Sequence, residues 1–231
     1  MGFLFTESPT PDALERHVDL VRSLGEPADW DTCASAFERF NLRANTPRLS
    51  ALDEYTTRLD LPAHCDARRN ALTAAANAWL RENLDTLGAP TGASVARWME
   101  LLLGRSSAPR LRQDPAYARG GLHRYSLGDC QLESLWSAAL DRANGSTLHL
   151  CARAATLYLD ALFLHPYDNG NARLARALVY WLMQHEQHTS PAMHPLVLVP
   201  LRPGNRDDLQ RLAKVIAVSA SRENLHCKLT S

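Results

Sequence analysis

A histidine, a glycine-bearing turn and two arginines stand together in one short segment, 165–176, which reads His-Pro-Tyr-Asp-Asn-Gly-Asn-Ala-Arg-Leu-Ala-Arg. An imidazole has an ordinary pKa of ~6.5 and can remove a proton at neutral pH. Arg173 and Arg176 lie three residues apart, so their guanidinium groups project from one turn of a helix and can hold phosphate oxygens in pairs. The segment therefore predicts a base, His165, beside a phosphate site.

The helix that follows supplies the rest of this anion site. Apolar residues continue with helical character over 174–183, and the first N–H groups of a helix have no partner within it. Gly170 can take a positive φ and lets the backbone approach a ligand, while Asn171 and Ala172 would present their N–H groups outward. His165 ends the preceding apolar run, so we expect it to face this site across the turn.

The same residues resemble the signature of the Fic family, His-x-Phe-x-Asp/Glu-Gly-Asn-Gly-Arg-x-x-Arg. The resemblance implies that the histidine activates a hydroxyl as general base. It implies that the glycine, asparagine and arginine positions bind the phosphates of ATP or another nucleotide, and that AMP passes to a protein. It also implies an all-α, Fic-like helical bundle. The matching positions in this signature loop, 165–176, are His165, Tyr167 (for the phenylalanine), Gly170, Asn171, Arg173 and Arg176.

Two residues differ from the signature at positions that, in the family, bind the metal and the phosphates. Asn169 stands in place of the carboxylate that holds Mg²⁺ against the phosphates, and a neutral amide oxygen is a poor ligand for this hard cation. Ala172 replaces the second glycine, and its Cβ costs about 1 kcal/mol if the backbone there needs a positive φ. Asp168 lies one residue before the position of that carboxylate. It is either a solvated turn residue or, if the loop is reshaped, a substitute ligand for the metal. Asn169 and Asp168 are therefore weak candidates for binding Mg²⁺.

The resemblance extends to a segment upstream of the signature loop. Arg112 is followed by Gly120 and Gly121 between two short runs, and paired glycines predict a hairpin turn. This segment resembles the one in which an arginine of the family precedes the flap, a short β-hairpin over the active-site loop. We therefore expect a flap at about 112–125, on which a target protein docks by adding a strand.

A third resemblance concerns regulation. Many Fic proteins carry an inhibitory helix with the pattern Ser/Thr-x-x-x-Glu-Gly/Asn, whose glutamate pairs with the second arginine of the signature. Ser219, Glu223 and Asn224 fit this pattern near the C-terminus. The pattern is loosely specified and equally fits an ordinary surface helix that ends with Asn224 as its C-cap.

The composition limits the partners that we expect. Lysine plus arginine equals aspartate plus glutamate at 25 each, so no overall charge attracts nucleic acid or an acidic membrane. No apolar run reaches the ~18 residues that a membrane helix needs. The five cysteines lack metal-ligand spacing. We expect a cytoplasmic protein whose partner is a target protein or a small-molecule hydroxyl; a homodimer stays open.

Helical periodicity dominates the rest of the chain. A break at 88–92 precedes a helix that Ser94 would cap. We therefore expect an N-terminal helical region over 1–93, packed on a Fic-like core over 94–231. Apolar spacing predicts helices at about 12–24, 31–40, 68–87, 95–103, 131–142, 148–164, 174–183 and 206–224, and an extended stretch at 196–199.

Three functions are consistent with these residues. The first is transfer of AMP, or a related phosphate-containing group, from a nucleotide to a hydroxyl, with His165, Arg173 and Arg176 as catalytic residues. The second is a Fic-fold enzyme with different chemistry on a small molecule, which would account for Asn169 and Ala172 together. The third is a degenerate protein that binds a nucleotide or a partner without catalysis. His165 favours transfer, because a binding module needs no base.

Overall fold

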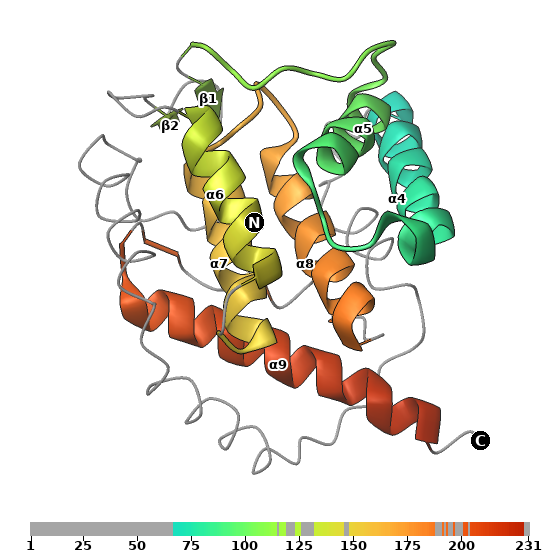
Figure 1. The fold of residues 1–231 in the computed structure, drawn as a ribbon, viewed down its shortest axis with the longest axis vertical. Coiled ribbons are helices and arrows are strands. Elements are labelled where there is room, and N and C mark those ends of the chain that lie inside the picture. Colours follow the sequence, from blue (N-terminus) through green and yellow to red (C-terminus); the bar gives the residue numbers. More distant parts are fainter. Residues whose placement is uncertain are drawn as a thin grey trace.

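Helices make up most of the chain that the structure describes. The computed structural model describes residues 67–114, 116–118, 123–125, 132–145, 148–187 and 204–228, with 191, 193, 196, 201 and 202; at 117–118, 123–125 and 221–228 it describes the backbone alone. The all-α fold class that the sequence predicts is confirmed. The helices in these ranges are α4 (Ala67–Leu87), α5 (Gly92–Leu103), α6 (Leu132–Gly145), α7 (Leu150–Phe163), α8 (Asn171–Gln187) and α9 (Arg206–Lys228) (Figure 1).

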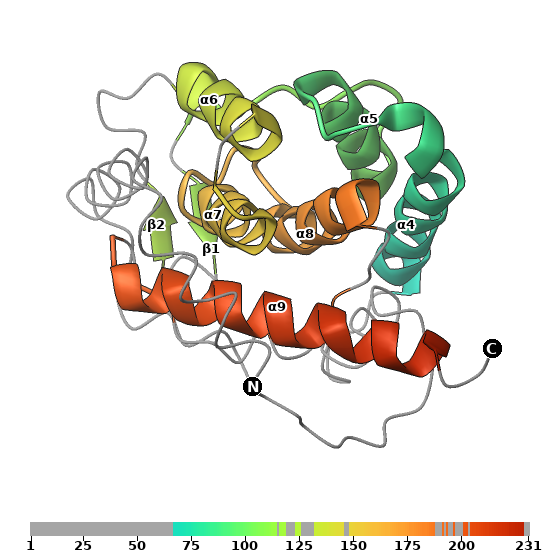
Figure 2. The same cartoon turned by 60° about the horizontal axis from the view of Figure 1, so that its bottom comes forward.

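Helix α7 lies at the centre of the bundle. All its residues are buried, because α8 runs beside it, α6 covers one face and α9 crosses the opposite face (Figure 2). Helix α8 is buried without interruption from Leu174 to Met183. Each large apolar side chain removed from water in this way contributes ~1.5–3 kcal/mol. The packing of α7 and α8 therefore fixes both ends of the connection between them.

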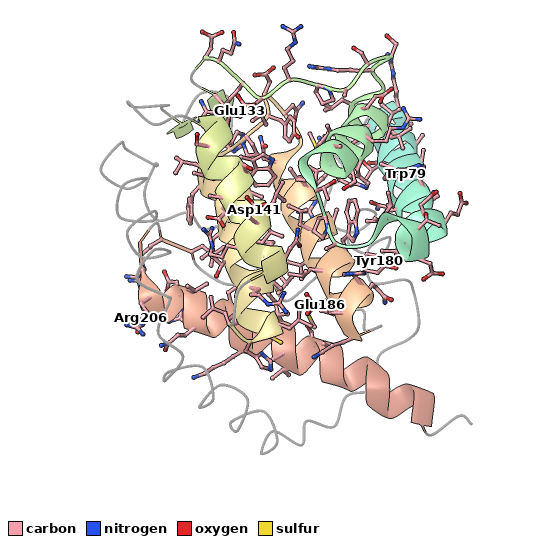
Figure 3. The ribbon with its side chains drawn as sticks, in the orientation of Figure 1. Trp79, Glu133, Asp141, Tyr180, Glu186 and Arg206 are labelled. Carbon is pink, nitrogen blue, oxygen red and sulfur yellow. The ribbon has the colours of Figure 1, made fainter. Side chains whose placement is uncertain are left out.

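Two buried charges of α7 have partners on the neighbouring helices. Asp160 accepts from Arg142 of α6 at 2.5 Å. Arg153 donates to both carboxylate oxygens of Glu186 and, at 2.6 Å, to the Ala143 carbonyl. A buried charge without a partner is costly, so these pairs select one placement of α6 and α8 against α7. Glu186 lies at the end of α8 away from the α7–α8 connection (Figure 3).

The caps explain where two helices begin. Thr91 Oγ1 accepts from the Ser94 N–H at 3.2 Å, and Ser94 Oγ accepts from the Thr91 N–H at 2.9 Å. The prediction of Ser94 as the cap was wrong, because this reciprocal pair makes Thr91 the N-cap and starts α5 earlier. Helix α9 begins as predicted, where Asn205 Oδ1 accepts from the Asp208 N–H at 3.0 Å.

A pair of short strands stands in the segment predicted as the flap. β1 (Ala116–Ala118) and β2 (His123–Tyr125) are antiparallel, with Ala116 opposite Tyr125 and Ala118 opposite His123. The residues that join the strands lie outside the described ranges. The action of this pair as a flap over the active-site loop stays a prediction.

Much of the predicted N-terminal region lies outside the described residues, including the helices expected at 12–24 and 31–40. Of the extended stretch expected at 196–199, only Leu196 is described. The described part of that N-terminal region is 67–93, and its helix α4 packs against α5 and α8. Among the described helices, none has both the length and the apolar character required to cross a membrane.

Candidate active site

The signature loop forms the connection between α7 and α8 and the first turns of α8. Helix α7 ends at Phe163, and its C-cap Leu164 donates from its N–H to the Asp160 carbonyl at 2.9 Å. Helix α8 begins at Asn171. The segment 104–114, between α5 and β1, passes over this connection (Figure 1). His165, the glycine turn and the start of α8 are thus gathered at one end of the bundle.

Arg112 fixes this connection through three successive carbonyl groups. Its Nε donates to the His165 carbonyl at 2.6 Å, its Nη2 to the Leu164 carbonyl at 3.0 Å and its backbone N–H to the Pro166 carbonyl at 2.9 Å. Its Nη1 donates to the Asp114 carbonyl at 2.8 Å, and the residue is 4% exposed. Hydrogen bonds from a charged donor are about twice as strong as neutral ones, so these contacts set the path of the connection.

His165 has a strained backbone. Its φ of 50° makes it the one non-glycine residue with a positive φ in the described ranges. This conformation costs an L-residue roughly 1–2 kcal/mol. Arg112 contributes to it, because it binds carbonyls on both sides of the His165 Cα.

The environment of His165 keeps its imidazole neutral. Burial lowers the pKa of this side chain to about 4; a hydrogen bond with the Leu162 backbone opposes the shift, and the charge of Arg112 adds to it. At neutral pH the ring is therefore unprotonated. An unprotonated imidazole can accept a proton, but a lowered pKa makes it a weaker base than a free imidazole.

Asn171 ties the start of α8 back to the connection. Its Oδ1 accepts from the Tyr167 N–H at 3.0 Å, and its Nδ2 donates to the Tyr167 carbonyl at 2.6 Å. Both residues are at most 2% exposed, and burial raises the pKa of the Tyr167 phenol to about 12. The Asn171 side chain, predicted as a phosphate ligand, thus positions the loop through the Tyr167 backbone.

Gly170 is the last residue of the connection before α8 begins at Asn171. Its φ is 85°, and its carbonyl accepts from the N–H groups of Arg173 and Leu174 at 3.0 and 2.9 Å. A Cβ on this residue would lie 2.9 Å from Leu102 Cδ2 and 3.3 Å from Met99 Cε of α5. The missing side chain therefore lets the turn pack on α5, a role that the sequence did not indicate.

Ala172 is the second residue of α8 and packs, half-buried, against the core. Its φ is not positive, because His165 alone among the described non-glycine residues has that conformation. The backbone strain considered for this position therefore does not arise. The N–H groups of Asn171 and Ala172 precede the first N–H group of α8 that bonds a carbonyl, that of Arg173. N–H groups at this place in a helix are suited to bind an anion, so the predicted role of these two residues stays a prediction.

The two signature arginines lie on the first two turns of α8 and are partly or fully buried. Arg173 Nη1 donates to Thr73 Oγ1 of α4 at 3.0 Å, and Arg176 is 7% exposed. Asn77, one turn further along α4, is 1% exposed, and neither polar atom of its side chain has a hydrogen-bond partner in the described ranges. Helix α4 therefore borders the predicted phosphate site with polar side chains.

Sequence reasoning missed Thr73 and Asn77. Both occupy the buried face of α4, four residues apart, between apolar positions such as Ala76 and Leu80. A hydroxyl followed four residues later by a longer polar side chain is also the spacing of Ser219 and Glu223. The same signal, applied to a helix with an otherwise apolar buried face, could have identified this pair.

The residues proposed for metal binding lie at the exposed tip of the connection. Asn169 Oδ1 accepts from the Gly170 N–H at 2.7 Å. Burial lowers the pKa of the Arg112 guanidinium, and the Asp168 carboxylate opposes this through its charge. In the described ranges no three His, Cys, Asp or Glu side chains are grouped to hold a metal. An engaged amide oxygen and a carboxylate facing an arginine do not fit a Mg²⁺ site.

The structure does not bring the predicted regulatory segment to the signature arginines. Ser219 is buried within α9 and donates to the Ile216 carbonyl at 2.9 Å. Helix α9 crosses the bundle at the end away from the signature turn (Figure 1). The side chains of Glu223 and Asn224 lie outside the described residues, so the inhibitory role stays a prediction. Asn224 as a C-cap was wrong, because α9 continues to Lys228.

Replacing Gly170 with alanine tests its packing role. Gly170→Ala combines backbone strain with a collision against Leu102, so we expect a loss of about 2–3 kcal/mol in the free energy of unfolding, measured with urea. Gly88→Ala is the matched control: Gly88 also has a positive φ, of 64°, but no atom within 4 Å of the added Cβ. It should lose only about 1 kcal/mol; equal losses would contradict the packing role.

The depressed pKa of His165 makes stability depend on pH. The folded pKa of about 4 lies below the unfolded value, so the unfolded chain binds more protons between these pH values. The free energy of unfolding should fall by up to about 3 kcal/mol as the pH is lowered from 7 to 4. His165→Asn should remove most of this dependence, whereas His185→Asn at an exposed position should not. An NMR titration that places the His165 pKa above 6 would refute the assignment.

Comparisons with known proteins bear on the fold. No protein-family model matches the chain, and no curated protein matches it by sequence. Among solved structures, a Fic family protein from Desulfovibrio desulfuricans G20 is similar with 14% identity and a TM-score of 0.51, covering 96% of this chain and 77% of that one. Two structures of Fic-1 from C. elegans each share 17% identity. The first has a TM-score of 0.55, and the match covers 95% of this chain and 73% of the Fic-1 chain. The second has a TM-score of 0.54, and the match covers 98% of this chain and 69% of the Fic-1 chain.

These likenesses span nearly the whole chain, although the identities are low. The connection that carries His165 and Gly170 lies between two core helices, and Arg173 and Arg176 lie on the second of them, α8. The chain therefore has a Fic-like fold.

Proposed function

We propose that the protein transfers AMP, or a related phosphate-containing group, from a nucleotide such as ATP to a hydroxyl group on a protein. The observation that carries the proposal is the state of His165. This residue is neutral at pH 7, is held in a strained conformation by Arg112, and is joined by one tight turn to the N-terminus of α8. A base next to an anion-binding helix end suits the activation of a hydroxyl toward a phosphate.

In this proposal the chain's own groups bind and neutralise the donor. The N–H groups of Asn171 and Ala172 and the guanidinium groups of Arg173 and Arg176 bind its phosphates. His165 takes the proton of the acceptor hydroxyl as its oxygen forms a bond to the α-phosphorus. The bond from that phosphorus to the bridging oxygen breaks, and pyrophosphate leaves. Because Asn169 and Asp168 do not fit a Mg²⁺ site, no step is assigned to a metal.

A second candidate is nucleotide or partner binding without transfer. It is favoured by the engagement of two predicted phosphate ligands within the protein: Arg173 donates to Thr73, and the Asn171 side chain binds the Tyr167 backbone. A divergent reaction on a small-molecule hydroxyl is a variant of the first candidate. Neither alternative requires a change in the fold.

Intact-mass spectrometry of the purified protein and a mixture of candidate acceptor proteins, incubated with ATP, tests the proposal. We expect a mass increase of one AMP group, or release of pyrophosphate, that His165→Ala reduces at least a hundredfold, the typical contribution of a general base being ~10²–10⁴. His185→Ala, at an exposed position of α8, is the matched control and should leave activity unchanged.

Two results would count against transfer. Product formed equally by the wild type and His165→Ala would exclude His165 as the base. Nucleotide binding with no product that depends on His165 would favour the second candidate.

A further inference from the structure

A polar pocket lies beside the signature turn and takes no part in the proposed chemistry. Its volume is about 380 Å³, near the lower end of the ~300–1,000 Å³ usual for ligand sites. The segment 105–114 forms most of its wall, and Asp168 of the connection completes it. The pocket therefore opens next to the loop that carries His165.

The charges that line this pocket are unequal. Arg105, Arg110 and Arg112 contribute three positive groups, against Asp114 and Asp168. The Arg112 guanidinium is buried and occupied by carbonyl groups, and Asp168 faces it electrostatically. With Arg112 and Asp168 set against each other, Arg105 and Arg110 outweigh Asp114 by one positive charge.

Arg105 and Arg110 are both exposed, and neither side chain forms an ion pair or hydrogen bond with a described residue. Glu100, the one acid of α5, pairs with Arg97 at 2.7 Å. Two guanidinium groups at a pocket wall, each with five N–H donors, are suited to bind carboxylate or phosphate oxygens in pairs.

The segment that carries these arginines is held at both ends. At its start, Gly104 takes a left-handed conformation and donates to the Glu100 and Leu101 carbonyls at the end of α5. At its far end, Arg112 binds the carbonyls of the α7–α8 connection, and between them Pro109 is buried. A wall fixed in this way loses little conformational entropy when a ligand binds.

We propose that this pocket binds an acidic segment of the acceptor protein, with Arg105 and Arg110 holding its carboxylates. This assignment rests on the proposed function. Because Asp168 lies three residues after His165, an anchored carboxylate would hold the acceptor within a few residues of the reacting hydroxyl. The chemistry favours acceptor hydroxyls followed or preceded by aspartate or glutamate over those in basic sequences.

The test uses fluorescein-labelled peptides in which serine alternates with glutamate, with lysine, or with phosphoserine. Fluorescence anisotropy gives their affinity for the full-length protein at low ionic strength, where exposed charges act most strongly. We expect the glutamate peptide to bind and the lysine peptide not to bind. The double variant Arg105→Glu/Arg110→Glu should bind the glutamate peptide at least about tenfold more weakly.

A control double variant carries the same charge change elsewhere. Arg206→Glu/Lys214→Glu alters two exposed positions of α9, and Arg206 lies at the end of the bundle away from the pocket (Figure 3). Its affinity for the glutamate peptide should stay within twofold of the wild type. Arg105→Ala/Arg110→Ala removes charge without reversing it, and should also weaken binding. Circular dichroism shows that each variant is folded before binding is measured.

Equal affinity of the wild type and the pocket variants, or no binding of the glutamate peptide, would overturn the assignment. Binding of the phosphoserine peptide alone would overturn it as well, because the pocket would then select phosphate. The test is separable from the proposed function. If the pocket variants lose peptide binding while the wild type forms no nucleotide product, the result supports the peptide-binding pocket and contradicts the proposed transfer reaction.

Discussion

The hydrogen bonds from Arg112 to the carbonyls of Leu164 and His165 decide the geometry of the candidate site. They join a segment that leaves α5 to the turn that leaves α7, across more than fifty residues of sequence. A buried guanidinium has few alternatives, because each unsatisfied donor is costly. The Arg112 hydrogen bonds therefore set the backbone path of the turn. They hold His165 in a backbone conformation that is unfavourable for a residue with a side chain. The same contact places positive charge beside the imidazole and adds to the lowering of its pKa.

Every other feature of the site builds on that turn. Gly170 turns the chain into α8 and packs on α5, and Asn171 closes the turn on the Tyr167 backbone. Arg173 of α8 then donates to Thr73 on the buried face of α4. Groups drawn from α4, α7, α8 and the segment after α5 thus converge on a few residues. This convergence depends on the buried packing of α7 and α8, which holds the ends of the connection in place.

The sequence predicted the elements but not all of their contacts. The apolar periodicity of α4, α7 and α8 indicates helices, because burial on one side or all sides leaves a regular pattern. The signature residues indicated where the site lies, since their types are needed for binding phosphate. For Arg112 the sequence indicates only a place before a hairpin, because contacts between distant segments leave no local pattern. Leu102, which excludes a Cβ at Gly170, was missed for the same reason.

The crystal structure of the Arg112→Met variant tests the central claim most directly. Methionine keeps the backbone N–H that binds the Pro166 carbonyl, but it removes the donors to the Leu164 and His165 carbonyls. With those bonds gone, His165 should relax to a negative φ and its imidazole should move. A variant structure in which His165 keeps its positive φ and its position would show that Arg112 does not determine the geometry of the site.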